Sequence, residues 1–256
     1  NMIRALVELG GQGGFIGKIA DDEFGRYFND SMTSRGVETY MLFSNTQPSG
    51  VASTFISTDG ERTFATHLGA AAEQKADELK QEMFEGYHYL FIEGYLVQDH
   101  ELITRAMHLA KEAGLIVCLD MASYNIVSAE KAFLTQLINK YVDVVFANEQ
   151  EAEAFTGLKA SEAINETPKH CSIAILKGNG IHTCPCPRCG RGNRHYRSWR
   201  LFCCRFPLWP LYGTIVGTLC TNRYPISRRG DSSSRYRIGS NYMGKAKATH
   251  SKFIIY

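Results

Sequence analysis

The stretch LIVCLDMASYNIVSAEKAFLTQLINKYVDVVFANEQE, residues 115–151, decides the fold class. Two short apolar runs, 115–119 and 142–147, are separated by a helical pattern over 129–140. Strands that are apolar on both faces and alternate with amphipathic helices are typical of a parallel sheet covered by helices on both sides. We therefore predict an α/β fold with a mostly parallel central sheet.

The same alternation extends outward from this stretch until about Gly180. We predict further strands at 14–19, 40–43, 51–57, 62–66, 87–92 and 172–176, and further helices at 2–9, 22–35, 73–84, 99–113 and 149–155. The turn signal Thr58–Glu61 predicts that the strands on either side of it form a hairpin. Beyond Gly180 neither helical nor strand periodicity continues.

Polar residues close several of the predicted strands: Glu93, Asp120, Asn148 and Lys177. In parallel sheets, ligands bind beyond the carboxyl ends of the strands, so these residues are candidates for a ligand crevice. Asp120, Asn148 and Glu151 offer the oxygen ligands of a magnesium–phosphate network. The alternative is helix capping, with Asn148 as the N-cap and Glu151 as its capping-box partner. The spacing by itself favours capping.

Charge and cysteine divide the chain into a unit at 1–182 and a tail at 183–256. The tail contains 14 Lys and Arg residues against one acid, Asp231, and six of the eight cysteines, although the whole chain carries a net charge of only +2. The chain has no apolar run of about 18 residues, so we expect no membrane span. The first unit has two well-separated cysteines, as expected of a reduced, cytoplasmic protein.

The tail also offers potential zinc ligands, among them a C-x2-C pair: Cys184, Cys186, Cys189, His195, Cys203 and Cys204. The surrounding basic residues would suit nucleic acid, so a zinc-binding, nucleic-acid-contacting module is an alternative function. Against it, Cys203 and Cys204 are adjacent and cannot form a second C-x2-C knuckle.

Several motifs, in order along residues 1–180, resemble the ribokinase (PfkB) family. The segment Gly17–Gly25 is similar to the pattern GxxGxDxxG, with Ala20 in place of the inner glycine, and 146–151 (FANEQE) is similar to N-x-x-E. The other matching stretches are 1–9, 48–66 (PSGVASTFISTDGERTFAT), 91–95 (FIEGY) and 119–125 (LDMASYN).

The resemblance implies a ribokinase-like three-layer αβα sandwich with a partial β-lid around 38–66. It implies transfer of the γ-phosphate of ATP to a hydroxymethyl group of a sugar or nucleoside, as in adenosine kinases. Asn148 and Glu151 would organise Mg²⁺ and phosphate, Asp120 and Lys177 would lie at the nucleotide, and Asn1 would contact the sugar. Members of the family often form homodimers through the lid, and nucleic acid is not an expected partner.

Two features of the family are missing from the sequence. The first strand and the glycines before Asn1 are absent, so we expect the fold to be incomplete at both ends. The motif DTxGAGD is absent too. Its last aspartate is the general base of the family, and its glycine-rich turn forms an anion hole at a helix N-terminus. We therefore expect no catalysis by the chain as written, or at most a non-catalytic nucleotide-binding remnant.

A shift of the reading frame after about residue 180 accounts for the missing motif. Codons can be chosen for residues 193–210 (NRHYRSWRLFCCRFPLWP) that, read one base later, spell IDTTGAGDYFAAGFLYGL. The codon of the general-base aspartate would then span those of Arg200 and Leu201. Alanine codons preceded by T read as cysteine in the shifted frame, which explains the adjacent pair Cys203 and Cys204. Under this hypothesis the tail is an out-of-frame product, and its cysteine cluster does not have to be explained as a zinc site.

Overall fold

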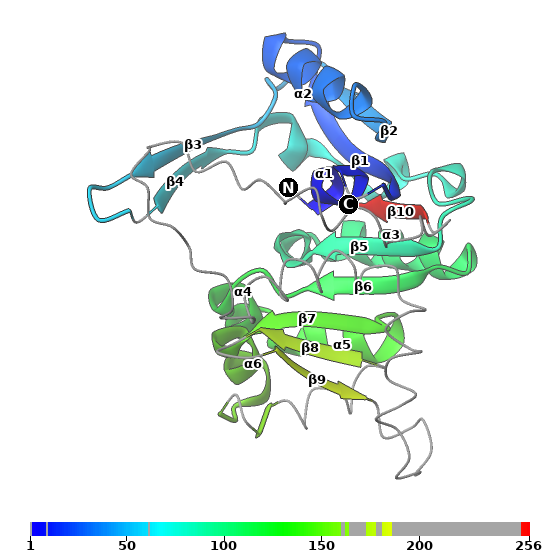
Figure 1. Cartoon of the computed structure of the whole chain (residues 1–256). Coiled ribbons are helices and arrows are strands. Elements are labelled where there is room, and N and C mark those ends of the chain that lie inside the picture. The colour runs from blue at the N-terminus through cyan, green and yellow to red at the C-terminus, as the bar shows by residue number, and fades with distance from the viewer. Residues whose placement is uncertain are drawn as a thin grey trace.

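A computed structural model of the chain describes residues 2–8, 10–60, 62–159, 162–163, 173–177, 181–185 and 252–256 (Figure 1). The α-helices are α1 (Met2–Glu8), α2 (Glu23–Thr33), α3 (His100–Glu112), α4 (Tyr124–Ala129), α5 (Lys131–Lys140) and α6 (Glu149–Thr156). The strands are β1 (Gln12–Ala20), β2 (Glu38–Ser44), β3 (Val51–Ile56), β4 (Arg62–His67), β5 (Tyr89–Glu93), β6 (Ile116–Asp120), β7 (Val144–Asn148), β8 (Ile173–Lys177), β9 (Ile181–Pro185) and β10 (Lys252–Ile255).

Eight strands form one sheet, in the order β2-β1-β10-β5-β6-β7-β8-β9. Every neighbouring pair is parallel except β8 and β9, which are antiparallel. The predicted α/β fold with a mostly parallel sheet is therefore confirmed. Strands β3 and β4 form a separate antiparallel hairpin that extends away from the main sheet in Figure 1, and we call this hairpin the lid.

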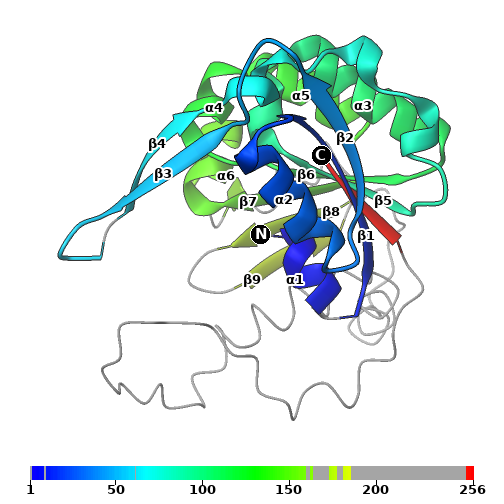
Figure 2. The ribbon, with the colours of Figure 1, turned by 90° about the horizontal axis from the view of Figure 1, so that it is seen from above.

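Helices cover both faces of the sheet, as Figure 2 shows: α3, α4 and α5 lie on one side, and α1 and α2 lie on the other. Strand residues alternate between two cores because successive side chains point to opposite faces. Leu90 and Ile92 of β5 pack with the α3 side, whereas Tyr89 and Phe91 pack with Ile3 and the rest of the α1 side. A sheet buried on both faces explains the uninterrupted apolar runs in the sequence.

The helix predicted at 73–84 is wrong. This segment forms short 3₁₀ turns instead, η1 (Gly69–Glu73), η2 (Ala76–Glu78) and η3 (Gln81–Met83), separated by residues with extended backbone. Leu79 and Phe84, two of the apolar residues whose spacing resembled that of a helix, are nevertheless buried. The polar contacts of Glu73 and Glu78, described below, hold these turns against β1 and β2. A further 3₁₀ segment, η4 (Gly94–Gln98), follows β5.

Parts of the predicted tail lie in the main sheet. β9 runs across the expected boundary between residues 182 and 183, and β10 is an interior strand of the sheet, between β1 and β5. The division of the chain stays a prediction for residues 186–251, which are outside the described part of the structure. Among the described helices, none has the length and apolar character needed to cross a membrane.

Candidate functional site

The carboxyl ends of β5 to β8 lie along one edge of the sheet. Glu93 at the end of β5 is the register partner of Asp120 at the end of β6. Farther along, Asn148 at the end of β7 pairs with Lys177 at the end of β8. The predicted convergence of these four strand ends is thus present in the backbone. Carboxylates and an amide therefore gather where parallel sheets bind their ligands.

Asn148 and Glu151 form a capping box at the start of α6. The Asn148 Oδ1 accepts a hydrogen bond from the Glu151 backbone N–H at 2.9 Å, and the Asn148 backbone N–H donates to Glu151 Oε2 at 2.8 Å. The Asn148 side-chain amide donates to Glu151 Oε1 at 2.6 Å. Glu151 is buried, so these bonds hold its negative charge at the N-terminus of a helix. The capping predicted from spacing is confirmed, and it rigidly orients the same two side chains assigned to phosphate and magnesium.

Asp120 lies where β6 turns toward α4. Its Oδ1 accepts a hydrogen bond from the Ala122 backbone N–H at 2.9 Å, and Ala122 has a positive φ of 61°. Such a backbone conformation is uncommon for a residue other than glycine and clusters at functional sites.

Although Glu93 keeps exposed surface, partial burial of its carboxyl group and the negative charge of Asp120 raise the pKa of Glu93.

The motif 17–25 forms the turn from β1 into α2. Asp22 caps α2 by accepting from the Gly25 backbone N–H at 2.8 Å, and its second oxygen accepts from the Ser49 backbone N–H at 2.8 Å. The bonds from Ser49 and Gly25 lower the pKa of Asp22. A Cβ atom on Gly25 would lie 2.1 Å from the carbonyl oxygen of Ala20, which explains why glycine is needed there. The motif therefore anchors the segment that leads into the lid.

The two connections of the lid pack directly against each other. The Ala70 backbone N–H donates to the Pro48 carbonyl at 2.8 Å. A Cβ atom on Gly69 would lie 2.2 Å from that same carbonyl, and one on Gly50 would lie 2.6 Å from the Leu68 carbonyl. These close backbone approaches fix the base of the lid. Its hairpin exposes large apolar side chains, including Phe55, Ile56 and Phe64.

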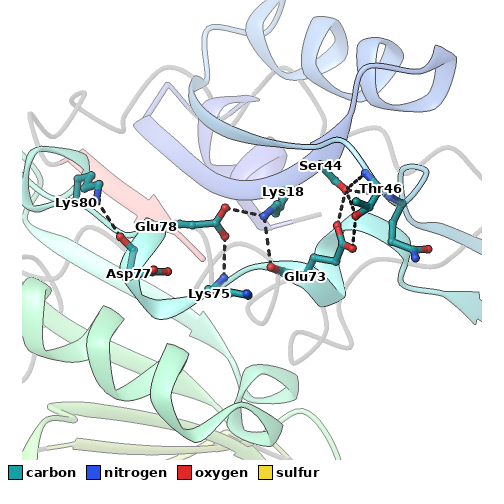
Figure 3. A network of polar contacts seen from close by, with 9 residues as sticks. Lys18, Ser44, Thr46, Glu73, Lys75, Asp77, Glu78 and Lys80 are labelled. Carbon is teal, nitrogen blue, oxygen red and sulfur yellow. Dashed lines mark hydrogen bonds and ion pairs between the residues drawn. The ribbon is translucent and has the colours of Figure 1, made fainter.

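A polar network joins the base of the lid to the main sheet (Figure 3). Lys18 of β1 donates to Glu78 Oε1 at 2.6 Å and to the Glu73 backbone carbonyl at 3.3 Å. The Glu73 carboxylate in turn accepts from the hydroxyl groups of Ser44 and Thr46. The bond from Ser44, followed by that from Thr46, lowers the pKa of Glu73. We call these five residues the lid clasp, because Ser44 and Thr46 precede the hairpin and Glu73 follows it.

The sequence did not identify the lid clasp. Its members are spread over residues 18–78, and each is a common surface residue type without a motif of its own. The one signal available in the sequence was the position of Lys18 inside the 17–25 motif. In the structure its side chain is only 9% exposed. A buried lysine needs an anionic partner, but the sequence did not show which carboxylate folds against it.

Several predicted site residues lie outside the described part of the structure. These are Asn1, Arg200 and Leu201 together with the potential zinc ligands Cys186, Cys189, His195, Cys203 and Cys204. Cys184 lies in β9. Within the described ranges, no group of three or more His, Cys, Asp or Glu side chains is placed to hold a metal ion.

Comparison with known proteins places these features in a family. The model of the pfkB family carbohydrate kinases matches residues 1–180. Fructokinase-1 of Zea mays is 31% identical over 172 residues, which cover 63% of this chain and 53% of that protein. The 5-dehydro-2-deoxygluconokinase of Clostridium perfringens is 23% identical over 176 residues, 65% of this chain and 52% of that protein. The chain thus spans about half the length of these relatives.

Solved structures give the same result. A probable sugar kinase of Rhizobium etli superposes with a TM-score of 0.68 at 25% identity, covering 72% of this chain and 58% of the other. The adenosine kinase of Sinorhizobium meliloti superposes with a TM-score of 0.66 at 25% identity, covering 73% and 60%. Together with the family match over residues 1–180, these likenesses show that the chain belongs to the pfkB family of carbohydrate kinases.

Proposed function

We propose that the activity encoded by this fold is transfer of the γ-phosphate of ATP to a hydroxymethyl group of a sugar or nucleoside. The observation that carries the proposal is the edge of the sheet where Asp120 ends β6 and Asn148, capped by Glu151, ends the neighbouring strand β7, within a chain that matches the kinase family over residues 1–180. In phosphoryl transfer the protein mainly positions the reactants and neutralises charge on the moving group. Rigidly held polar groups at a strand edge suit that task.

Asn148 and Glu151 fit a water-mediated role toward Mg²⁺. Both carboxylate oxygens of Glu151 already accept hydrogen bonds from Asn148, and the described residues form no cage of three metal ligands. Mg²⁺ keeps several of its waters and binds mainly to substrate phosphates in kinase sites, so the fixed carboxylate would orient those waters. When bound, Mg²⁺ supplies charge neutralisation at the phosphates. Asp120 and Lys177 would lie at the nucleotide, and Asn1 would contact the sugar.

We further propose that the chain as written does not catalyse the reaction. The sequence lacks the motif DTxGAGD, so the aspartate that accepts the proton of the attacking hydroxyl is not present, and its codon would span those of Arg200 and Leu201. A frame shift after about residue 180 would explain the absence, because codons can be chosen for residues 193–210 that spell the motif in the shifted frame.

The test compares the chain with a frame-restored form. One form is expressed from the gene as it stands, and the other from a gene whose reading frame is corrected near codon 180. Both are assayed for ATP-dependent phosphorylation of fructose, ribose and adenosine. We expect turnover only in the frame-restored form. Turnover by the chain as written would contradict its proposed inactivity, and failure of the frame-restored form with all three acceptors would count against the kinase proposal.

The class of acceptor is a separate part of the proposal. The relatives include a fructokinase and an adenosine kinase, and the polar edge of the sheet suits the hydroxyl groups of either substrate. The same assay separates the two, because a sugar kinase would favour fructose or ribose and a nucleoside kinase would favour adenosine.

We propose homodimerisation through the lid as the assembly of the intact enzyme. The exposed side chains of Ile56 and Phe64, which lie on the same face of the hairpin, support it, since exposed apolar patches mark interaction surfaces. Light scattering after gel filtration should give a dimer mass for the frame-restored form and a monomer mass for its Ile56→Asp variant. A monomer before substitution would contradict the assembly.

A zinc-binding, nucleic-acid-contacting tail is the alternative proposal. It is tested by elemental analysis of the purified chain and of its Cys186→Ser and Cys189→Ser variants. Stoichiometric zinc that is lost in the variants would favour this alternative over a frame-shifted tail.

We place the protein in the cytoplasm, which the two separated cysteines of residues 1–182 support.

A further inference from the structure

The lid leaves the main sheet at the edge that carries the candidate site. Strand β2, which leads into the lid, ends at Ser44, and Ser44 is the register partner of Ala20 at the end of β1. Parallel pairing continues from β2 and β1 across the sheet to β8, so all these strands end at one edge. The root of the lid therefore lies at the same edge as Asp120 and Asn148, on the β1 side.

The first arm of the lid is tied to the turn from β1 into α2 through Ser49, which is buried. The Ser49 backbone N–H donates to Asp22 Oδ2 at 2.8 Å. The Ser49 Oγ accepts from the Ala20 backbone N–H at 2.9 Å. A single residue thus bonds to both ends of the turn, and it does so two residues before β3 begins at Val51.

The second arm of the lid is held by the first. The Ala70 backbone N–H donates to the Pro48 carbonyl at 2.8 Å, and Ala70 is fully buried. The backbone of Gly69 passes so close to that carbonyl that a Cβ atom would lie 2.2 Å from it. Backbones in such close contact have no room to slide past each other. A shift of residues 48–49 is therefore transmitted to the second arm.

Asp22 divides its two carboxylate oxygens between two elements. Oδ1 caps α2 by accepting from the Gly25 backbone N–H, and Oδ2 holds Ser49. A helix cap needs only one side-chain oxygen, since serine and asparagine cap as well as aspartate does. The bonds to the Asp22 carboxylate are charge-assisted, and the bond from the Ser49 backbone is the main cause of its lowered pKa. The second oxygen is thus not required by the helix and serves the lid.

We propose that Asp22 is a positioning residue for the lid, which sets the orientation of both arms through Ser49 and ties it to the start of α2. The functional consequence rests on the proposed phosphotransfer. Helix α1, which follows the proposed sugar contact Asn1, packs against β1, whereas Asn148 and Lys177 end β7 and β8. The lid is rooted on the side of the sheet proposed for the acceptor, so Asp22 should affect the binding of the acceptor and not that of ATP.

The test is the substitution Asp22→Asn in the full chain. Asparagine has the same shape and its side-chain oxygen still caps α2, but the NH₂ group that replaces Oδ2 cannot accept from the Ser49 N–H. A second variant, Asp22→Ser, keeps one capping oxygen on a shorter side chain. Hydrogen exchange measured by mass spectrometry compares the amides of the arms, residues 44–50 and 68–72, with those of α2.

The matched control is Asp99→Asn. It makes the same chemical change at the N-cap of α3, where the aspartate accepts from the Leu102 backbone N–H at 2.9 Å. This control should leave the exchange of the lid arms as in the wild type.

We expect both Asp22 variants to exchange the amides of the arms, including that of Ala70, at least about tenfold faster than the wild type, because a charge-assisted hydrogen bond is lost. The amides of α2 should exchange as in the wild type. Faster exchange of α2 together with the arms would show that Asp22 is only a helix cap. Unchanged exchange of the arms would show that Ser49 does not depend on Asp22, and either result would overturn the proposal.

Kinetics of the frame-restored form test the functional consequence. Asp22→Asn should raise the KM of the acceptor at least about threefold and leave the KM of ATP unchanged, because a poorly positioned lid lowers the fraction of molecules competent to bind the acceptor. Equal rises of both KM values would contradict a positioning role. Absence of turnover in the frame-restored wild type would count against the proposed phosphotransfer, and the exchange result would still decide whether Asp22 positions the lid.

Discussion

The Nζ atom of Lys18 lies 2.6 Å from Oε1 of Glu78, and this ion pair joins β1 to the 3₁₀ turns that follow the lid. The Lys18 side chain is 9% exposed and that of Glu78 is 28% exposed, so water screens the pair less than it screens a surface pair. Glu78 also accepts from the Lys75 backbone N–H at 2.8 Å, which fixes its carboxylate in the turn η2. The lid clasp thus depends on a partly buried charge with defined partners.

Substitution of Lys18 by methionine should destabilise the protein. The change keeps most of the side-chain volume but leaves the Glu78 carboxylate without its cation, at a cost of about 1–3 kcal/mol in the free energy of unfolding. Urea denaturation measures this loss. The control is Arg4→Met, which breaks the Arg4–Glu8 pair on the surface of α1, where both side chains are more than half exposed. Its cost should stay below about 0.5 kcal/mol, and equal losses would count against the buried role of Lys18.

The stability of the protein should decrease in acid, partly through the lid clasp. Folding lowers the pKa values of Asp22, Glu73 and Glu78, so the unfolded chain binds more protons than the folded chain as the pH falls through and below their ordinary values. Their stabilising contribution is present above this range and is lost within it. A Glu73→Gln variant should therefore show a shallower decrease of the urea midpoint with falling pH. An unchanged slope would contradict the prediction.

Glu93 should have the opposite effect on stability. Its pKa is raised in the folded state, so its favourable contribution is present in acid and is lost as the pH rises above the ordinary value of 4.5. Glu93→Gln removes the charge that partial burial and Asp120 disfavour. We expect its urea midpoint to exceed that of the wild type at neutral pH and to match it in acid. A variant that is less stable at neutral pH would show that the Glu93 carboxylate makes a compensating contact.

Substitution of Gly25 by alanine should disrupt the turn from β1 into α2. The added methyl group would lie 2.1 Å from the Ala20 carbonyl oxygen and 2.6 Å from the Ser49 Oγ, and a backbone carbonyl has little freedom to move aside. Overpacking of this kind costs about 1–3 kcal/mol. The control is Gly36→Asn, at a position with φ +80° and open space, where asparagine tolerates the left-handed backbone. Thermal unfolding should show the larger loss for Gly25→Ala.

Two substitutions of Asn148 should separate capping from a role in phosphate binding. Asn148→Ala loses the cap of α6 and should cost about 1 kcal/mol in stability, whereas Asn148→Ser keeps a capping oxygen and should stay close to the wild type. In the frame-restored form, both should bind MgATP more weakly by calorimetry, because neither has the amide that orients Glu151. Wild-type affinity in Asn148→Ser would limit Asn148 to a structural role.

The sequence predicted most of the elements because their signals are local. Unbroken apolar runs identified β5, β6 and β7, and Asp22, Asp99 and Asn148 were in the capping positions that start α2, α3 and α6. The prediction was wrong at 73–84, where apolar residues at helical spacing are compatible with successive 3₁₀ turns. Tertiary contacts of Glu73 and Glu78 with β1 and β2, and not the spacing, determine the backbone there.

The amino-acid sequence by itself determined the fold class, the polar ends of β5 to β8 and the capping pair Asn148 and Glu151. Periodicity and capping act over a few residues, so they can be recognised along the chain. Only the tertiary structure decided that Lys18 meets Glu78 and that residues 252–255 form an interior strand between β1 and β5. Both depend on which distant segments share a core, and the energy of such contacts comes from burial and pairing that a linear pattern does not contain.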